Sequence, residues 1–258
     1  MDFIIKQCVA WTGGLTTTQD WQAYAQGHKS LSSLQELPPL KQIPAMQRRR
    51  LSPFAKLALH CALTAADDCL ATVPSVFTSR HGDLAKTSKL IEDVAAKEPL
   101  SPTNFGLSVH NAVGGLFSIY TGNKAPLTAI SAGEDSFFVG MLDALAKLIA
   151  NNYQQILLVF TEQLVPEIYQ PFVEQDETAI ACALLLEAVP QTSLTVGEKQ
   201  QVFSLSMQAN QVKKSKENTC MQVLEFLKFY YSLCDRNNNQ TISINSKRHH
   251  WQLTKRVS

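Results

Sequence analysis

Apolar residues along this chain follow two alternating patterns, short continuous runs and repeats at three- and four-residue spacing. Continuous runs are typical of strands covered on both faces, whereas the three- and four-residue spacing is typical of amphipathic helices. The runs predict strands at residues 3–11, 73–79, 127–132, 156–161 and 178–188. The spacing predicts helices at residues 51–70, 87–96, 110–121, 137–149 and 219–233.

This order of strands and helices predicts an α/β fold, layered α-β-α, with a mainly parallel sheet. Prolines between residues 22 and 44 predict irregular structure there. After Pro190 the pattern changes, because residues 194–216 are polar and lysine-rich and residues 235–258 resemble a polar tail. We therefore expect a domain at residues 1–190 and a small C-terminal appendage at residues 191–258.

Length and charge exclude several classes of protein. A chain of 258 residues can bury one sizeable core. Its formal net charge of +1 gives no basic surface for nucleic acid. No uncharged apolar run approaches the ~18 residues that a membrane helix requires. The first residues lack the layout of a secretory signal, so we expect a cytoplasmic protein.

Cysteine and histidine positions do not indicate a metal site or a cofactor. The six cysteines show no Cys-x-x-Cys spacing and have apolar neighbours, which predicts buried, reduced thiols. His249 and His250 are adjacent in a basic stretch, so we expect solvated side chains there. We expect neither a metal nor a cofactor.

The most informative stretch is residues 108–150. A GNKAP turn at residues 122–126 precedes the predicted strand at residues 127–132 and the predicted helix at residues 137–149. This order resembles the nucleophile region of β-ketoacyl synthases, condensing enzymes of the thiolase fold, in which a Gly-x-Lys/Arg-x-Pro turn precedes a strand, the catalytic cysteine and a helix. RRRLSPFAKLALHCA and ILLVFTEQLVPE resemble further segments of that family, so the resemblance extends over residues 45–190.

The nucleophile of that family is missing. Counting from Pro126 without gaps puts the cysteine position at Glu134, or at Gly133 if the register shifts by one. Neither residue can form a thioester. After Pro190 no HGTGT-, GHxxG- or NxxFGFGG-like motif supplies the two catalytic histidines of the family. The resemblance therefore implies a truncated, half-length thiolase-like fold that does not condense acyl groups on its own, similar to a chain length factor.

The same resemblance implies partners. A chain length factor forms a heterodimer with an active β-ketoacyl synthase, which can pair further into a dimer of heterodimers, and meets acyl carrier protein through that complex. SPTNFGLSVHNAVGG and APLTAISAGEDSF resemble half-length proteins of aryl polyene pathways, which implies polyketide or fatty acyl biosynthesis. Half a fold leaves apolar surface exposed, so we expect a partner interface above ~2,000 Å². The run from Arg48 to Arg50 is expected to be solvated, with a carrier-protein contact as the alternative.

By resemblance, the helices at residues 110–121 and 137–149 would meet the partner and wall the end of its acyl tunnel. The expected tunnel or interface residues are His110, Asn111, Phe117, Tyr120, Ser131, Glu134, Phe137 and Phe138. Core packing is the alternative for the aromatic rings, whereas a ring in the tunnel would stop the growing acyl chain. Glu134 is expected to begin a helix, where the helix dipole favours a carboxylate, and to do no acid–base work.

A second hypothesis is a stand-alone acyltransferase or thioesterase. It would use His110 with Ser131 or Glu134, or a triad of Ser131, His110 and Asp135. No serine lies in the Gly-x-Ser-x-Gly elbow that exposes such nucleophiles, so the pattern supports this hypothesis weakly. Without a catalytic role, His110 would bond to backbone groups or to a partner.

Overall fold

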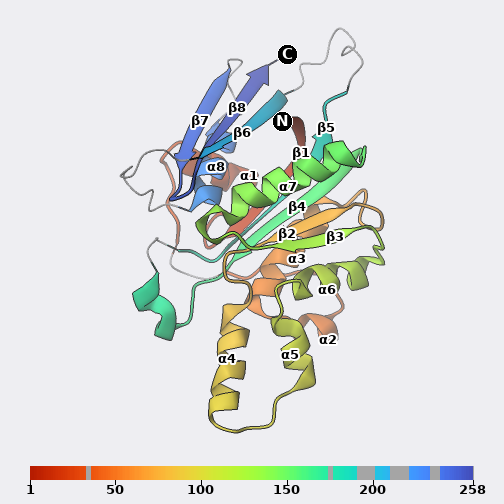
Figure 1. The fold of residues 1–258 in the computed structure, drawn as a ribbon, viewed down its shortest axis with the longest axis vertical. Helices are drawn as coiled ribbons and strands as arrows, with labels where there is room; N and C mark the ends of the chain where they lie inside the picture. Colours follow the sequence, from red (N-terminus) through yellow and green to blue (C-terminus); the bar gives the residue numbers. More distant parts are fainter. Residues whose placement is uncertain (33–35, 174–176, 191–200, 210–220, 233–238, 258) are drawn as a thin grey trace.

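The structure is a computed structural model, and it describes residues 1–32, 36–173, 177–190, 201–209, 221–232 and 239–257. These residues form one eight-stranded sheet in the order β3-β2-β4-β5-β1-β6-β8-β7 (Figure 1). The strands are β1 (Asp2–Thr12), β2 (Ser75–Thr78), β3 (Leu127–Ile130), β4 (Gln155–Glu162), β5 (Ile180–Ala188), β6 (Gln201–Ala209), β7 (Gln240–Asn245) and β8 (His249–Val257). All five strands predicted from the continuous apolar runs are confirmed.

The prediction of a mainly parallel sheet is wrong. Only β2 pairs in parallel, with β3 and with β4, and the five other neighbouring pairs are antiparallel. Continuous apolar runs indicate that both faces of a strand are covered, but they do not indicate its direction. β5 shows this plainly, because it is buried over most of its length and antiparallel to both of its neighbours.

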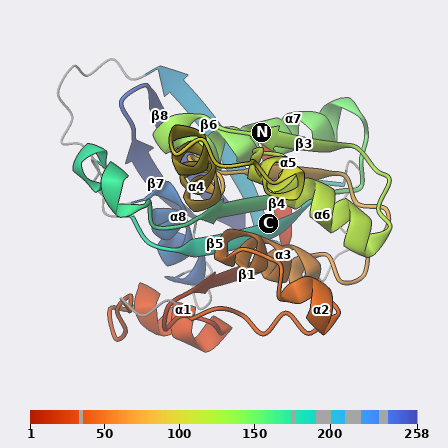
Figure 2. The same ribbon diagram turned by 90° about the horizontal axis from the view of Figure 1, so that it is seen from below.

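The helices are α1 (Thr18–Ala25), α2 (Ala45–Arg48), α3 (Pro53–Ala65), α4 (Leu84–Ala95), α5 (Pro102–Ser108), α6 (Ala112–Thr121), α7 (Ser136–Ala150) and α8 (Gln222–Ser232). Two 3₁₀ turns are η1 (Gly133–Asp135) and η2 (Glu167–Phe172). α3 and α6 pack on one face of the sheet, whereas α7, α8 and α1 lie on the other (Figures 1 and 2). The predicted α-β-α layering is therefore confirmed.

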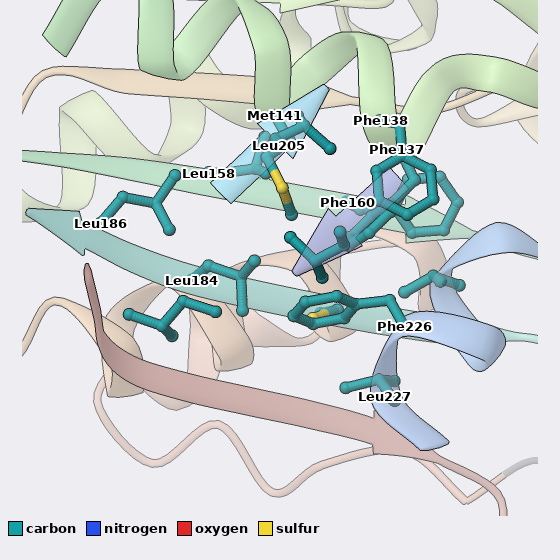
Figure 3. Close-up of a cluster of buried hydrophobic side chains, with 14 of the residues drawn as sticks. Phe137, Phe138, Met141, Leu158, Phe160, Leu184, Leu186, Leu205, Phe226 and Leu227 are labelled. Carbon is teal, nitrogen blue, oxygen red and sulfur yellow. The ribbon is translucent and has the colours of Figure 1, made fainter. Parts of the chain in front are cut away.

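The two sheet faces each bury a core, and alternate residues of the central strands supply them. On β4, Leu157 and Val159 face α3, while Leu158 and Phe160 face α7. The second group packs with side chains from α7 and α8 (Figure 3). A strand with both faces apolar must lie inside the sheet, and this burial holds the end of β4 in place.

Helix ends follow the expected local chemistry. Ser52 Oγ accepts a hydrogen bond from the Ala55 N–H at 3.1 Å, and Pro53 occupies the first turn of α3. α1, α2 and α5 are additions that the apolar spacing did not predict, because helices of one or two turns show too little periodicity to be recognised. The segment at residues 22–44, which was expected to be irregular, begins inside α1, because that helix ends at Ala25.

The prediction of a polar tail at residues 235–258 is wrong. β7 and β8 form a hairpin, and Ile244, Trp251 and Leu253 join the core on the α7 side. These strands alternate between polar and apolar residues, which is typical of strands with one solvated face, and that alternation lowers the apolar content of the segment. The described residues after residue 190 share the sheet and a core with those before it. A domain boundary at residue 190 stays a prediction.

Parts of the predicted polar stretch at residues 194–216 lie outside the described residues, and β6 occupies the part that is described. Cys220 and Cys234 also lie outside. Of the other cysteines, Cys61 and Cys182 are buried as predicted, whereas Cys8 and Cys69 are half-buried. None of the described helices is long and apolar enough to cross a membrane.

Candidate functional site

The turn between β3 and α7 is the position at which the resemblance places the nucleophile. Gly133 adopts a left-handed backbone conformation, with φ of 63°, which favours glycine. Ser136 closes the turn, because its Oγ donates to the Gly133 carbonyl at 2.7 Å and accepts from the Ala132 N–H at 3.0 Å. The Glu134 carboxylate accepts from the backbone N–H of Lys247 at 2.6 Å. Glu134 thus lies at the start of a helix, as predicted, and also binds the connection between β7 and β8.

Asp135 is the centre of a buried hydrogen-bond network, which we call the Asp135 cluster. Its side chain is 2% exposed. Oδ1 accepts from Trp251 Nε1 at 2.7 Å and from Gln222 Nε2 at 2.8 Å. Oδ2 accepts from Ser246 Oγ at 2.9 Å and from His249 Nδ1 at 2.8 Å. A carboxylate with both oxygens bonded in this way is well compensated for its burial, and it ties the turn to α8 and to the β7–β8 hairpin.

Two adjacent cavities, which we call the outer and the inner cavity, lie beside this turn. The outer cavity holds about 200 Å³ and is lined by Arg80, Ala132, Gly133, Glu134, Asp135, Lys247 and Arg248. The inner cavity holds about 20 Å³, and Glu162, Glu177, Phe137, Phe160 and Gln222 are among the residues that line it. Arg80, Gly133 and Glu134 border both cavities, so the two are adjacent.

Glu162 ends β4 at the floor of the inner cavity and is 2% exposed. Its Oε1 accepts from Ser79 Oγ at 2.9 Å and from the backbone N–H of Arg80. Burial raises the pKa of the Glu162 carboxyl to about 7, because desolvation penalises the charged form more than the hydrogen bonds favour it. This group therefore changes its charge near neutral pH.

The three residues of the hypothetical triad are not assembled. His110 Nε2 donates to the Ser79 carbonyl at 3.1 Å, and Ser131 Oγ donates to the Arg80 carbonyl at 2.9 Å. Asp135 is engaged in its own cluster. Within the described part of the chain, no hydrogen bond joins any two of the three, so the arrangement supplies no nucleophile with an adjacent base.

Most of the predicted tunnel aromatics lie in the core of this chain. Phe117, Phe137 and Phe138 are almost completely buried, and Phe138 stacks on Trp251 with the ring centroids 5.4 Å apart. Tyr120 is half-buried. A ring with no exposed area contacts its own chain only, so core packing accounts for these three rings. Asn111, by contrast, is exposed at the start of α6.

Apolar side chains are exposed on the helices that extend from β3, and we call these side chains together the β3-side surface. β3 has a neighbouring strand on one side only among the described residues. α6 packs against it, followed by α5 and α4, which pack on each other and project beyond the sheet (Figure 1). Large apolar side chains are exposed along these elements: Ile91, Val94, Leu100, Phe105, Val109 and Ile119.

The periodicity did not identify Arg80, Glu162, Gln222, Ser246, His249 and Trp251 as site residues. His249 was expected to be solvated, which is wrong, because it binds the buried Asp135 from β8. One signal was available for Glu162. It is the first charged residue after an otherwise apolar strand, and an isolated carboxylate at the end of a buried strand indicates a polar contact there.

Comparisons with known proteins agree with this geometry. The family model described as "Beta-ketoacyl synthase, N-terminal domain" matches residues 20–252. A chain from the ketosynthase ApeO in complex with its chain length factor ApeC, from Xenorhabdus doucetiae, is 27% identical, with a TM-score of 0.82 over 98% of this chain and 99% of that one.

More distant structures show the fold alone. The ishigamide ketosynthase/chain length factor is 11% identical, with a TM-score of 0.74 over 100% of this chain and 99% of that one. A ketosynthase of the bacillaene synthase from Bacillus amyloliquefaciens FZB42 is 14% identical, with a TM-score of 0.58, and the match covers 83% of this chain but 47% of that one. The half-length fold is therefore confirmed.

A search of curated proteins found no match. The family model nevertheless spans all but the two ends of the chain, from before the end of α1 into β8. The chain belongs to the β-ketoacyl synthase N-terminal domain family.

Proposed function

We propose that this chain is a non-catalytic, chain length factor-like subunit that pairs with an active β-ketoacyl synthase and shapes its acyl cavity. One observation carries the proposal: Gly133 and Glu134, which the resemblance aligns with the thiol position of condensing enzymes, lie in the turn between β3 and α7, and Glu134 is bonded to the chain's own C-terminal hairpin. The described cysteines do not line either cavity. Burial raises the pKa of the Cys61 thiol, which disfavours a thiolate.

The β3-side surface supports the choice of partner. An unpaired strand edge beside exposed apolar side chains is the kind of surface that a stable subunit interface covers. Ile119 is 74% exposed and Phe105 is 60% exposed. Gly115 lies one turn before Ile119 on α6, and nothing lies within 4 Å of the position of its missing side chain. Another backbone can therefore approach α6 closely at this point.

The structure also changes which residues are the best candidates for limiting chain length. Phe117 and Phe138 are core residues of this chain, so we propose that an exposed neighbour on the β3-side surface reaches the partner's tunnel instead. Ile119 is the first candidate, because it projects from the same helix as Phe117 and is exposed. Tyr120 stays a candidate because it is half-buried.

The pathway follows from resemblance. We propose that the partner elongates an acyl chain carried by acyl carrier protein, in aryl polyene biosynthesis or a related polyketide or fatty acyl system. A chain from a ketosynthase in complex with its chain length factor matches over nearly the whole length of both chains, which supports this assignment. A cytoplasmic location stays a prediction.

The test is reconstitution with a β-ketoacyl synthase found by a search of the genes next to the one that encodes this chain. The purified pair should elongate carrier-bound acyl groups, and Glu134→Gln should leave the turnover within a few-fold, since the carboxylate does no acid–base work. A hundredfold loss of turnover in a pair that still assembles would contradict the non-catalytic role.

Product length gives the second measurement. Mass spectrometry of carrier-bound products should show longer chains with Ile119→Ala from an intact pair. Phe138→Ala is the matched core variant, and it should reduce the amount of the pair without a change in length, because truncating a buried ring costs ~3–5 kcal/mol. If Phe138→Ala lengthens the products and Ile119→Ala does not, the ring reaches the tunnel after all.

A further inference from the structure

Three side chains that line the inner cavity each have a buried acceptor atom with no hydrogen-bond partner among the described residues. These atoms are Glu162 Oε2, Glu177 Oε2 and Gln222 Oε1. The Glu177 side chain and the Gln222 residue are each 7% exposed, and Glu162 is buried more deeply still. A buried acceptor without a partner costs ~1–3 kcal/mol, so this arrangement favours a bound hydrogen-bond donor.

The other atoms of these side chains are already engaged, so each contributes one free acceptor when Glu162 is ionised. Glu162 Oε1 accepts from Ser79 Oγ. Glu177 Oε1 contacts His81 Nε2 at 3.1 Å and an Arg80 guanidinium nitrogen at 3.5 Å. Gln222 Nε2 donates to the Asp135 carboxylate, which can only accept, and this contact fixes the free end of the amide as its oxygen.

The number and charge of these acceptors favour an ammonium group. A water molecule offers two protons, whereas a primary ammonium offers three N–H donors for the three free acceptors. Glu134, Glu162 and Glu177 line the inner cavity against one cation, Arg80. A space of about 20 Å³ admits a single small group. No group of three His, Cys, Asp or Glu side chains in the described part of the chain could hold a metal ion.

The outer cavity has the opposite charge balance. Arg80, Lys247 and Arg248 line it together with Glu134 and Asp135, and Asp135 is already bonded by His249 and three other donors. A molecule with its ammonium in the inner cavity would therefore extend toward cationic side chains. An anionic end suits that position, because a carboxylate or sulfonate is attracted by lysine and arginine.

We propose that the two cavities form a binding site for a small zwitterion of the amino-acid type, with the ammonium against Glu162, Glu177 and Gln222 and the anionic end near Lys247 and Arg248. Three elements that are distant in the sequence meet here: the end of β4, the segment before β5 and the start of α8. The site is distinct from the β3-side surface and does not depend on the proposed function.

Protonation supplies a readout that is specific to this site. Glu162 is faced by Arg80 and His81 after β2, by Glu177 before β5 and by Glu134 in η1. An ammonium beside Glu162 favours its charged form and lowers the pKa of its carboxyl. Since that pKa is about 7 in the free chain, binding at pH 7 should release protons.

The experiment is calorimetric titration of the full chain with five probes: glycine, β-alanine, 4-aminobutanoate, methylammonium and butanoate. We expect at least one of the three zwitterions to bind at least tenfold more tightly than methylammonium, and butanoate to show no binding. Repeating the titration in two buffers with different ionisation enthalpies should reveal proton release. Equal affinity for butanoate and the best zwitterion would overturn the proposal, and so would no binding of any probe, which is the result for a cavity that holds only water.

Variants separate the two ends of the site. Glu162→Gln and Glu177→Gln should each weaken binding of the best zwitterion at least tenfold, and Glu162→Gln should abolish the proton release. Arg248→Gln should weaken the zwitterion but leave methylammonium unchanged. Circular dichroism establishes that each variant is folded. Unchanged affinity in both folded Glu→Gln variants would overturn the assignment of the ammonium position.

Discussion

The two edges of the sheet differ in how far the chain covers their apolar side chains. At one end, β7 alternates exposed and less exposed residues, and its neighbours Trp251 and Leu253 on β8 face the core. At the other end, β3 is a four-residue strand beside helices that expose large apolar side chains. At the first edge the chain itself covers the apolar side chains. At the second edge they are exposed among the described residues, which is typical of a surface that a partner covers.

The Asp135 cluster explains why the C-terminal end is closed. Its hydrogen bonds join the β3–α7 turn to a hairpin more than a hundred residues later in the chain. The position that the resemblance assigns to the nucleophile is therefore bonded to the chain's own C-terminal hairpin. At the opposite edge of the sheet, no described strand pairs with the outer edge of β3, and we propose that the partner binds there.

The largest expected effect on stability comes from a substitution in the Asp135 cluster. Asp135→Ala leaves three buried donors and the half-buried His249 without their acceptor and should lower the free energy of unfolding by ~3–5 kcal/mol. Urea denaturation of the chain or of the assembled pair measures this. Asp143→Asn on the same helix is the matched control, because its partly exposed ion pair with Lys147 contributes ~0.3–0.5 kcal/mol. Equal effects of the two variants would mean that the cluster does not hold the hairpin.

A smaller effect is expected from pH at the inner cavity. The folded chain keeps Glu162 protonated up to a pKa of about 7, whereas the unfolded chain loses that proton near the ordinary pKa of 4.5. Between these values the folded state binds more protons, so the free energy of unfolding should fall as pH rises, by up to about 3 kcal/mol, and should level off above pH 7.

Unfolding midpoints measured from pH 4.5 to 8 for the wild type and Glu162→Gln test this. The variant should lack this part of the decline, because it has no titrating group at that position. Parallel curves for the two proteins would show that the folded and unfolded states hold this proton equally.

The smallest effects should separate packed from open helix surfaces. Gly140 in α7 lies against Thr78, with 2.7 Å between the Thr78 methyl carbon and the position of a new side-chain carbon. Gly140→Ala should therefore destabilise the chain by ~1–3 kcal/mol. Gly115→Ala on the β3-side surface should instead stabilise it by up to ~1 kcal/mol, since alanine favours the helix and meets no neighbour. Thermal unfolding of both variants distinguishes these signs.

The sequence predicted the positions of strands and helices more reliably than the direction in which the strands pair. The continuous apolar runs located the five N-terminal strands, because burial on both faces leaves an unbroken pattern. Strand direction was missed because the pattern carries no information about it. β6, β7 and β8 were missed because one-sided strands contain many polar residues, and the two-residue alternation of residues 240–245 is short.

The candidate site was only partly predictable. The GNKAP turn and the missing cysteine directed attention to Glu134, and Glu134 does lie at the start of a helix. The Asp135 cluster depends on contacts with residues 222, 246, 249 and 251, and local periodicity does not indicate contacts over such sequence distances. The burial of Phe117 and Phe138 likewise follows from packing, since an aromatic residue on a helix fits a core and an interface equally well.

The most direct test is to mix this chain with the β-ketoacyl synthase used in the reconstitution and to measure the mass of the assembly by native mass spectrometry. We expect a heterodimer, or a dimer of heterodimers, for the wild-type chain. Ile119→Asp on the β3-side surface should abolish it while the chain remains folded. Met207→Asp on β6, which also replaces an exposed apolar residue, should leave it intact. A wild-type chain that stays separate from the ketosynthase, or an Ile119→Asp chain that pairs as well as Met207→Asp, would contradict the central claim.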